Sequence, residues 1–174
     1  MPTGRDTRPT SDRAREGLFS TVQALLGSLA GARVADLYAG SGAVGLEALS
    51  RGAAHALLVE AHPKAARVIR DNVAALGLSG AELRSDRVER VVAQAPDAPY
   101  DLIFADPPYA VTDAEIVTLL EALRDHGWPA AEGLVAVERP TRGSAVAWPA
   151  GYTAARERKY GEATFWYGWY GPGA

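Results

Sequence analysis

The sequence predicts an α/β fold, with a seven-stranded, mostly parallel sheet, helices on both faces and an antiparallel hairpin at the C-terminal edge. Five apolar, strand-like segments alternate with helical segments before Pro140, and such alternation is typical of a parallel sheet. Residues 152–158 and 163–170 both look extended, with no helical segment between them. A hairpin of this kind commonly closes one edge of a parallel sheet. We therefore predict one domain over residues 10–174, preceded by an arm of residues 1–9.

The composition excludes several classes of protein and site. The 174 residues contain no cysteine, which rules out disulfides, thiolate metal ligands and a cysteine nucleophile. No apolar run approaches the length of a membrane span and the N-terminus lacks a signal-peptide core, so we expect a cytoplasmic protein with no membrane partner. His55, His62 and His126 share no metal-ligand spacing, so no metal site is expected. No apolar surface repeat suggests self-association, and we expect a monomer.

The net charge of −3 predicts no strong overall attraction to nucleic acid, so any such contact needs a local basic patch. Arginine would dominate that patch, because only two of the 18 basic residues are lysines. Four arginines gather near the N-terminus: Arg5, Arg8, Arg13 and Arg15. They form either a contact for nucleic acid or an ordinary solvated face, and charge alone does not choose between the two.

A helix is predicted to follow the arm. Thr10, Ser11 and Asp12 are good N-cap residues, and the helix would run to about Leu29. Apolar residues recur on one face of it at helical spacing, which indicates packing against a core. These residues are Leu18, Phe19, Val22, Leu25, Leu26 and Leu29.

A strand, a tight turn and a second helix are predicted around three glycines. Gly40, Gly42 and Gly45 match G-x-G-x-x-G, in which glycines permit positive φ, close approach of a ligand and tight helix packing. The pattern alone also fits a plain strand-to-helix turn. Two acids make it more specific, because Asp36 can reach the turn from the strand and Glu60 ends the next strand, 20 residues after Gly40. An acid at that place accepts hydrogen bonds from ribose hydroxyls, so this half is predicted to bind a ligand that contains ribose.

Asp86 is a third acid at the carboxyl end of a strand, here the short strand of residues 81–85. Its side chain would either meet the base of a bound nucleotide or cap the helix of residues 87–94, and the sequence supports both readings equally. The other predicted elements are a strand over residues 55–60, a helix from Pro63 to about Leu76 that Gly77 ends, a helix over residues 113–126 that begins at Thr112 or Asp113, and a strand over residues 134–138.

The segment from Tyr100 to Tyr109 is the strongest candidate for a site. Residues 102–105 form a short apolar run, typical of a strand buried on both faces. The strand must stop at Pro107, because proline has no N–H for the ladder. The residue before a proline is held in an extended conformation, so Asp106 is expected to project from the strand's end. Since ligands bind at the carboxyl ends of parallel strands, a carboxylate, a stiff backbone and an aromatic ring would meet at a site.

A dehydrogenase could use the glycine turn and Glu60, but it would need neither the acid ahead of the glycines nor the tetrapeptide D-P-P-Y from Asp106 to Tyr109. Together these features resemble the S-adenosylmethionine-dependent class I methyltransferases, and D-P-P-Y is similar to the motif of enzymes that methylate exocyclic or amide nitrogens. A closer resemblance is to the RsmD family. Residues 7–19 resemble its T-R-P-T-x-x-x-x-R-E-x-L-F signature, and residues 36–53 follow its cofactor loop almost residue for residue.

The resemblance implies a Rossmann-like class I methyltransferase fold and transfer of a methyl group from S-adenosylmethionine to the exocyclic N2 amine of one guanine in the 16S rRNA of the small ribosomal subunit. Asp36 would orient the glycine turn and the methionine amino group, Glu60 would hold the ribose hydroxyls, and Asp86 would hold the adenine amine. The implied catalytic residues are Asp106, Pro107, Pro108 and Tyr109. The implied cofactor-binding residues are Asp36, Tyr38, Gly40, Ser41, Gly42, Gly45, Glu60 and Asp86. The implied RNA-binding residues are Arg5, Arg8, Thr10, Arg13 and Arg15.

Three other functions stay open on the residues alone. They are another amino-methyltransferase, acting on adenine in DNA or RNA or on a glutamine amide in protein; a non-catalytic module that binds the cofactor or rRNA; and a dehydrogenase. The intact D-P-P-Y tetrapeptide argues against the non-catalytic module. Members of the family usually carry a glycine- and arginine-rich β-hairpin before T-R-P-T that is expected to contact RNA, whereas Met1 to Asp6 stand there in this chain. We therefore expect either a weaker grip on RNA or one that lies elsewhere.

Overall fold

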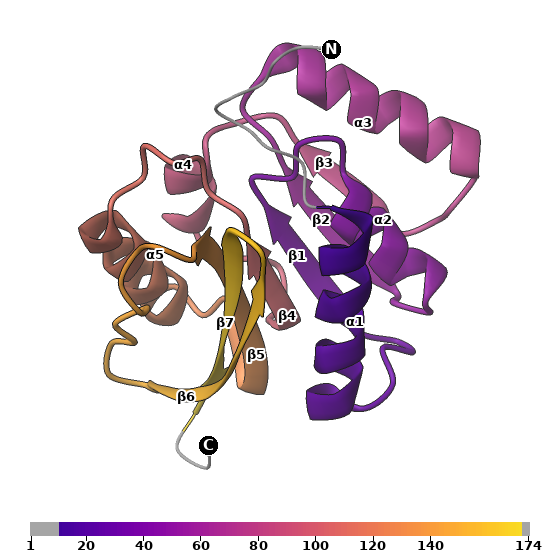
Figure 1. The fold of residues 1–174 in the computed structure, drawn as a ribbon. Coiled ribbons are helices and arrows are strands. Elements are labelled where there is room, and N and C mark those ends of the chain that lie inside the picture. The colour runs from indigo at the N-terminus through magenta and orange to yellow at the C-terminus, as the bar shows by residue number, and fades with distance from the viewer. Residues whose placement is uncertain (1–10, 172–174) are drawn as a thin grey trace.

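Seven strands form one sheet and five helices cover it in the computed structural model of the chain, which describes residues 11–171 (Figure 1). The strand order across the sheet is β3-β2-β1-β4-β5-β7-β6. Neighbours from β3 to β5 run parallel, and β7 runs antiparallel to both β5 and β6. The predicted fold, a mostly parallel seven-stranded sheet with a reversed C-terminal hairpin, is confirmed.

The elements follow the alternation that the sequence predicts. None of the helices among the described residues is both long and apolar enough to cross a membrane. In chain order the elements are α1 (Asp12–Leu26), β1 (Arg33–Leu37), α2 (Ala43–Ser50), β2 (His55–Val59), α3 (Pro63–Leu76), β3 (Ala81–Arg84), α4 (Val88–Val92), β4 (Tyr100–Ala105), α5 (Asp113–Asp125), β5 (Pro129–Pro140), β6 (Tyr152–Tyr160) and β7 (Ala163–Tyr170).

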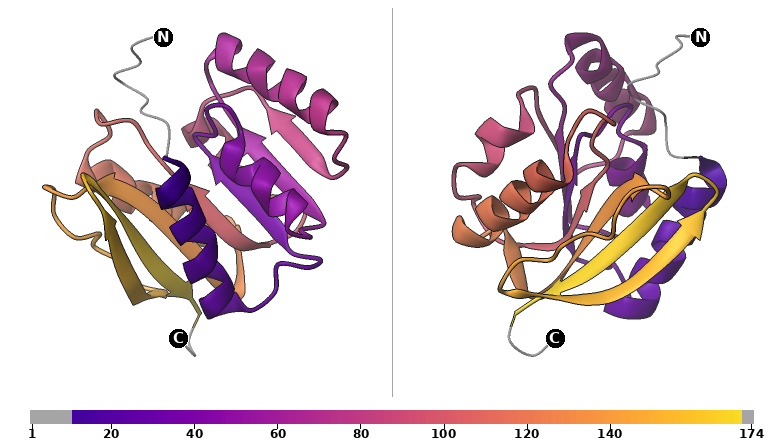
Figure 2. Two further views of the ribbon diagram at one scale, coloured as in Figure 1. Left: turned by 45° about the vertical axis from the view of Figure 1, so that its right-hand side comes forward. Right: turned by 60° about the vertical axis from the view of Figure 1, so that its left-hand side comes forward.

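Each face of the sheet has its own hydrophobic core, and Figure 2 shows the helices that lie over the two faces. Helices α1, α2 and α3 cover one face, and α4 and α5 cover the other. Successive side chains of a strand point to opposite faces, so Leu102 and Phe104 of β4 enter the first core while Ile103 and Ala105 enter the second. This double burial explains why β4 reads as an unbroken apolar run rather than an alternating one.

Helix α1 begins as predicted but ends earlier than predicted. The Ser11 hydroxyl accepts a hydrogen bond from the Ala14 N–H at 3.1 Å, as an N-cap should. Gly27 then ends the helix at a φ of 83°, with its N–H donating to the Gln23 carbonyl at 2.9 Å. Leu29 lies outside the helix yet is fully buried. Its apolar character fitted the helical spacing, which is why the sequence placed the end of α1 too late.

Two other predicted boundaries were wrong. Helix α4 is one turn shorter than the predicted span of residues 87–94. Strand β5 begins at Pro129, five residues earlier than predicted, because Pro129 pairs with Tyr100 before a register shift that precedes the pairing of Leu102 with Leu134. Glu132 lies within the irregular stretch at a positive φ of 65°. Such a bulge breaks the alternation from which a strand is recognised in sequence.

Helix α5 begins with a capping box at the end of the loop that leaves β4. The Thr112 hydroxyl accepts a hydrogen bond from the Glu115 N–H at 3.1 Å, and the Glu115 carboxylate accepts one from the Thr112 N–H at 2.8 Å. Both backbone donors are thereby satisfied at the start of the helix. The box fixes where the loop after β4 ends and α5 begins.

We predict that Thr112→Ala lowers the free energy of unfolding by about 1 kcal/mol, because it removes the acceptor for the Glu115 N–H. In a domain of this size the melting temperature should fall by roughly 2–4 °C. Thr118→Ala is the matched control, since that exposed hydroxyl only donates to the Ala114 carbonyl inside the same helix. Thermal unfolding of both variants checks this, and equal losses would show that the cap contributes nothing of its own.

Candidate functional site

The carboxyl ends of β1 and β4 bring the two main motifs together. Leu37 of β1 pairs with Ala105 of β4, so the next residues, Tyr38 and Asp106, leave neighbouring strands at the same edge of the sheet. This is also where the strand order reverses, because β2 lies on one side of β1 while β4 lies on the other. Open α/β sheets bind ligands in the crevice at such a switch point. The glycine turn and the D-P-P-Y tetrapeptide thus leave the sheet at the same edge, from neighbouring strands.

The three glycines of the turn are required for different reasons. Gly40 has a φ of 61° with open space where a side chain would be, so its backbone stays accessible. Gly42 has a φ of 86° and is the N-cap of α2. A Cβ on Gly45 would meet the Leu58 side chain at 2.9 Å and the Asp36 Cβ at 3.3 Å. Positive φ and close helix packing, two of the three predicted roles, are therefore observed, and the open side of Gly40 suits the third, the approach of a ligand.

Asp36 is a fully buried acid that joins β1 to α2. Its carboxylate accepts a hydrogen bond from the Gly45 N–H at 2.9 Å, so the predicted reach from the strand to the turn is observed. Its exposed fraction is only 1%. Burial raises the pKa of Asp36 from 3.8 to about 8, an effect that the Gly45 hydrogen bond opposes and the nearby Glu60 adds to. A buried carboxyl with so high a pKa, next to a ligand crevice, is typical of a functional group.

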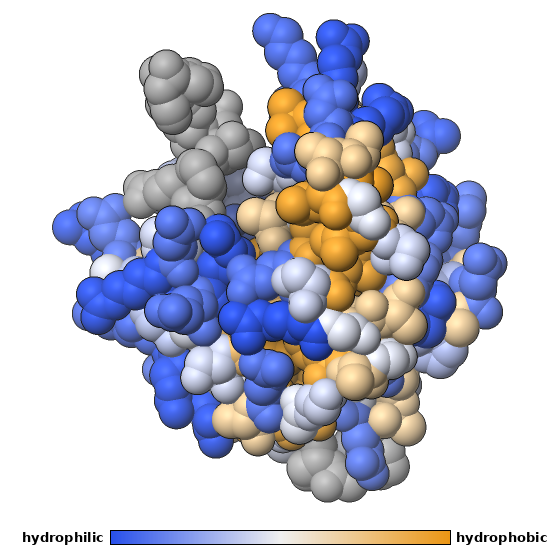
Figure 3. All heavy atoms as spheres, turned by 90° about the vertical axis from the view of Figure 1, so that its right-hand side faces the viewer, coloured by the Kyte–Doolittle hydropathy of each residue, from blue (hydrophilic) through white to orange (hydrophobic). Residues whose placement is uncertain are grey.

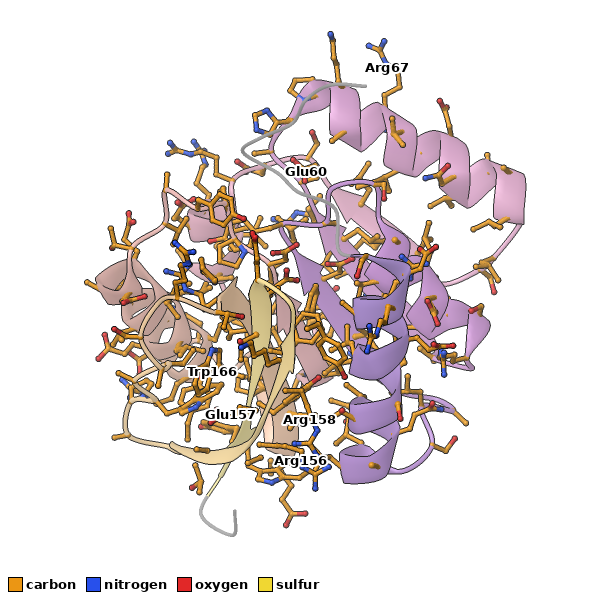
Figure 4. The ribbon with its side chains drawn as sticks, in the orientation of Figure 1. Glu60, Arg67, Arg156, Glu157, Arg158 and Trp166 are labelled. Carbon is orange, nitrogen blue, oxygen red and sulfur yellow. The ribbon has the colours of Figure 1, made fainter. Side chains whose placement is uncertain are left out.

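Glu60 holds the outside of the same turn. One carboxylate oxygen accepts the Gly40 N–H at 2.7 Å and the other accepts the His62 N–H at 3.0 Å. The side chain is buried, with an exposed fraction of 7%, and Figure 4 shows it at the sheet edge below the start of α3. Each carboxylate oxygen has a second lone pair, so both can still accept a further hydrogen bond. The turn is thus braced by one acid from β1 and another from the end of β2.

Asp86 follows β3 but does not cap α4 in the predicted manner. The N-cap residue of α4 is Arg87, whose N–H donates to the Asp86 carboxylate at 2.7 Å. The same carboxylate lies 3.5 Å from the Arg90 guanidinium one turn into the helix. The side chain is 40% exposed, so Asp86 remains accessible at the carboxyl edge next to Glu60.

The D-P-P-Y tetrapeptide begins directly after β4. Asp106 is half-buried and Pro107 is buried, while the Tyr109 ring is 55% exposed. The chain then turns, with the Val111 N–H donating to the Pro108 carbonyl at 3.0 Å. The predicted order of a carboxylate at the strand end, a stiff backbone and an outward ring is therefore observed.

The sequence did not predict that Tyr38 and Arg139 would support this part of the structure. Tyr38, the residue after β1, has a positive φ of 60°, which is strained for a non-glycine residue. Burial raises the pKa of Tyr38 to about 12, with Glu89 and Glu115 adding to the effect and Arg139 opposing it. Arg139, near the end of β5, donates to the Val111 carbonyl at 3.0 Å. No sequence motif marks Arg139, because its partner lies 28 residues away along the chain.

The predicted RNA-binding residues divide into two groups. Arg5, Arg8 and Thr10 lie outside the described residues. Arg13 is exposed at the start of α1, and no ion pair to it occurs within residues 11–171. Arg15 lies 2.8 Å from Glu47 and 3.1 Å from Asp12, so its charge is already compensated. Contact with RNA through Arg15 therefore requires that these pairs open or are shared.

A second hollow lies away from this edge, between α2 and α3. It measures about 640 Å³, and its floor includes Leu46, Leu76 and Leu78. Figure 3 shows apolar side chains gathered on this side of the molecule. Of the predicted cofactor residues only Ser41 lines it. Asp36, Glu60, Asp86 and Asp106 do not line this hollow, so it is separate from the crevice at the strand ends.

Charged side chains also lie on β6, the outer strand of the C-terminal hairpin. Figure 4 places Arg156 and Arg158 of β6 beside the lower half of α1, well apart from Glu60. Burial raises the pKa of the Tyr167 hydroxyl above its ordinary value, and the positive charges of both arginines oppose this rise. Charged side chains on an edge strand oppose pairing with other chains. Within the described part of the chain, no group of three or more histidine and acidic side chains could hold a metal ion.

Known proteins share both this sequence and this fold. Residues 1–169 match the family described as Conserved hypothetical protein 95. The ribosomal RNA small subunit methyltransferase D of Escherichia coli K12 is 34% identical over 166 residues, which cover 95% of this chain and 80% of that protein. A solved structure of the Escherichia coli methyltransferase yhhF superposes with a TM-score of 0.84 at 32% identity, covering 95% of this chain and 89% of that one.

A more distant structure shares the fold alone. An S-adenosylmethionine-dependent methyltransferase of Aquifex aeolicus is 15% identical, with a TM-score of 0.64 over 90% of this chain and 89% of that one. The match of nearly the whole sequence to one family agrees with the glycine turn, the D-P-P-Y tetrapeptide and the strand order described above. The chain therefore belongs to the Conserved hypothetical protein 95 family, which is the RsmD family of methyltransferases.

Proposed function

We propose that this chain transfers a methyl group from S-adenosylmethionine to the exocyclic N2 amine of a guanine in the 16S rRNA of the small ribosomal subunit. The observation that carries the proposal is that Tyr38 and Asp106 follow paired residues of β1 and β4. A cofactor loop and an amine-binding loop thereby share one crevice. The E. coli relative, a ribosomal RNA small subunit methyltransferase, supports the choice of substrate.

The residues around the glycine turn fit S-adenosylmethionine. The open backbone at Gly40 gives the ligand room, and Asp36 offers a carboxyl group to the methionine ammonium. Glu60 keeps lone pairs for two ribose hydroxyls while it braces the turn. Asp86, accessible on the next strand, would accept from the adenine amine. When bound, the cofactor supplies an electrophilic methyl group on a sulfonium.

Catalysis rests on positioning the amine rather than on a strong base. The guanine N2 lone pair is delocalised into the ring and is a poor nucleophile. The Asp106 carboxylate and the Pro107 carbonyl would each accept a hydrogen bond from one N2–H group. These two hydrogen bonds would favour a pyramidal nitrogen and aim its lone pair at the methyl group. The Asp106 carboxylate would offset the positive charge that develops on the nitrogen as it takes the methyl group from the sulfonium. The proton then leaves to water.

The exposed ring of Tyr109 suits stacking on a base that has left the helical stack. It is 55% exposed at the crevice, so one face of a base can stack on it. A guanine in a stacked helix cannot reach Asp106, which is half-buried at the strand end. The target base must therefore be unpaired or flipped into the crevice.

The first prediction that the proposed function makes concerns the catalytic carboxylate. Small ribosomal subunits from a strain lacking this gene should accept labelled methyl groups from the wild-type protein at one guanine N2. Asp106→Ala should lose at least about 100-fold in rate, because both the orientation and the charge stabilisation are removed. Asp125→Asn, at the far end of α5, is the control and should keep full rate.

Mapping of the modified nucleotide completes this test. Label on a different base would change the proposed target, and label on DNA or protein alone would favour one of the other amino-methyltransferases. Absence of any transfer, with S-adenosylmethionine still bound, would overturn the proposed activity. Binding of NAD instead of S-adenosylmethionine would overturn the choice of cofactor.

A second prediction follows from the raised pKa of Asp36. The folded protein holds the Asp36 proton up to about pH 8 whereas the unfolded chain releases it near 3.8. The folded state therefore binds more protons between these values, and stability without cofactor falls as the pH rises through this window, by up to about 1.4 kcal/mol per pH unit. Asp36→Asn keeps an oxygen for the Gly45 N–H but cannot ionise. Its stability should be nearly independent of pH between about 5 and about 8, apart from the contributions of other groups.

Urea unfolding at several pH values measures this slope. Asp101→Asn is the matched control, because Asp101 also accepts a backbone N–H, from Arg33 at 2.9 Å, but is only half-buried. The control should keep the wild-type slope. Identical slopes for wild type and Asp36→Asn would show that Asp36 is ionised in the folded protein. Asp36→Asn should also weaken S-adenosylmethionine binding, because the partner of its ammonium is lost.

A third prediction separates the two described N-terminal arginines. Arg13→Ala should weaken binding to small-subunit rRNA and reduce the slope of log affinity against log salt by roughly 0.7–0.9, the value for one phosphate contact. Arg15→Ala should change this slope by less than half as much, because Arg15 is already paired with Glu47 and Asp12. Filter binding across a salt series checks both. A larger slope change for Arg15→Ala would show that its ion pairs open on RNA.

A further inference from the structure

Arg139 is a buried cation that contacts the end of the loop that follows the D-P-P-Y tetrapeptide. It lies near the end of β5, and its side chain is 8% exposed. Its Nη2 donates to the Val111 carbonyl at 3.0 Å and lies 3.0 Å from the Asp113 carboxylate. Val111 is the last residue but one of the loop that starts at Asp106, and Asp113 is the first residue of α5. One guanidinium thus joins β5 to the loop and to the helix that follows it.

The ends of the loop are held by secondary structure. The loop is fixed at its start by the pairing of Ala105 with Val137 and at its end by the Thr112 capping box. Between them, the described backbone makes one internal hydrogen bond, from the Val111 N–H to the Pro108 carbonyl. Arg139 therefore adds a long-range polar contact near the end of this segment, through the Val111 carbonyl, and the Val111 N–H in turn ties that residue to Pro108.

Stability alone does not explain why a guanidinium lies here. Its Nη1 is buried and has no hydrogen-bond partner among the described residues, so the group makes fewer hydrogen bonds than it can offer. Its acidic partner Asp113 is 60% exposed, which weakens the ion pair through solvent screening. A well-packed apolar side chain of similar volume commonly replaces such a buried charge without loss of stability. What an apolar side chain cannot do is hold a backbone carbonyl in one place.

We propose that Arg139 is a positioning residue for methyl transfer, which sets the geometry of Asp106 to Tyr109 by holding the Val111 carbonyl against β5. The proposal rests on the proposed function, because it concerns the loop that would accept the guanine amine. The segment must aim the Asp106 carboxylate and the Pro107 carbonyl at two N–H bonds of one nitrogen, and a displacement of about 1 Å can cost about 100-fold in rate. Arg139 touches neither substrate nor cofactor in this role and acts through the loop.

The groups that face Arg139 agree with this assignment. Tyr38 lies close enough to be affected by its charge, and both Tyr38 and Val111 pack against the second core. Tyr38 follows β1 and stands two residues before Gly40 of the glycine turn.

The test compares two arginines: Arg139 of β5, which pairs with the first residue of α5, and Arg124 in the last turn of α5. Arg139→Met removes the contacts to Val111 and Asp113 while keeping an apolar stem. Arg124→Met is the matched control, because Arg124 likewise donates to a carbonyl, that of Ala150 at 2.7 Å, and to an aspartate, Asp125 at 2.9 Å. Arg139→Met should lower kcat for small-subunit rRNA by ~10–100-fold, with the Kd for S-adenosylmethionine within about twofold of wild type. Arg124→Met should leave kcat and this Kd unchanged.

A second readout does not depend on RNA at all. Amide hydrogen exchange should quicken around residues 107–113 in Arg139→Met, where the anchor is lost, and stay as in wild type in Arg124→Met. Arg139→Lys, which can still reach one acceptor, should recover part of kcat and part of the exchange protection. An Arg139→Met protein with wild-type kcat and wild-type exchange would overturn the proposal. A loss confined to KM for RNA would also overturn it, because it would make Arg139 an RNA-binding residue.

Failure of the proposed function has a different signature. In that case the wild-type protein itself transfers no methyl group to rRNA, whereas the exchange difference between Arg139→Met and Arg124→Met is still measured. Wild-type activity together with unaltered exchange in Arg139→Met would refute only the positioning role. Global unfolding of Arg139→Met, seen as exchange that quickens equally in β1 and β4, would contradict the inference that this charge is dispensable for stability.

Discussion

The parallel pairing of β1 with β4 is the constraint on which the rest of the site depends. Because Leu37 lies opposite Ala105, the residues that follow them leave the sheet together, one toward the glycine turn and the other into D-P-P-Y. A slip of one residue would turn every side chain of one strand to the opposite face. The two cores prevent such a slip, since β4 alternates Leu102 and Phe104 with Ile103 and Ala105 between them. The hydrophobic effect thus fixes the relative placement of two polar motifs.

The acids at this edge are held in three different ways, and each way suits a different role. Asp36 is buried with a single backbone donor, which leaves it with a high pKa and opposes stability without a ligand. Glu60 is buried with two donors, so its charge is better satisfied and it braces the turn. Asp106 is half-buried at the mouth of the crevice. Asp36 is thus the most deeply buried of these three acids.

The sequence could predict what depends on local patterns. The glycine spacing and the preceding Asp36 predicted a turn whose hydrogen bond is observed, and the proline after Asp106 predicted the end of β4. Local patterns failed where a buried residue outside an element continued its spacing, as Leu29 does after α1, or where a bulge interrupted the alternation, as around Glu132. The role of Asp86 also could not be chosen from the sequence, because a carboxylate before a helix suits both a backbone donor and a ligand.

Arginines show the same limit most clearly, since their roles depend on partners that are distant in the chain. Arg15 and Arg51 both pair with Glu47, and Arg139 holds a loop, so none of these charges is simply available to a polyanion. Lys64 and Arg67, by contrast, are exposed at the start of α3. Figure 4 shows Arg67 above Glu60. Within residues 11–171, no salt bridge involves either of these two cations. The net charge of −3 does not distinguish cations that are paired within the protein from cations that are unpaired. The attraction felt by a phosphate backbone falls off within a Debye length of about 8–10 Å, so local unpaired cations weigh more in it than the sum over the chain.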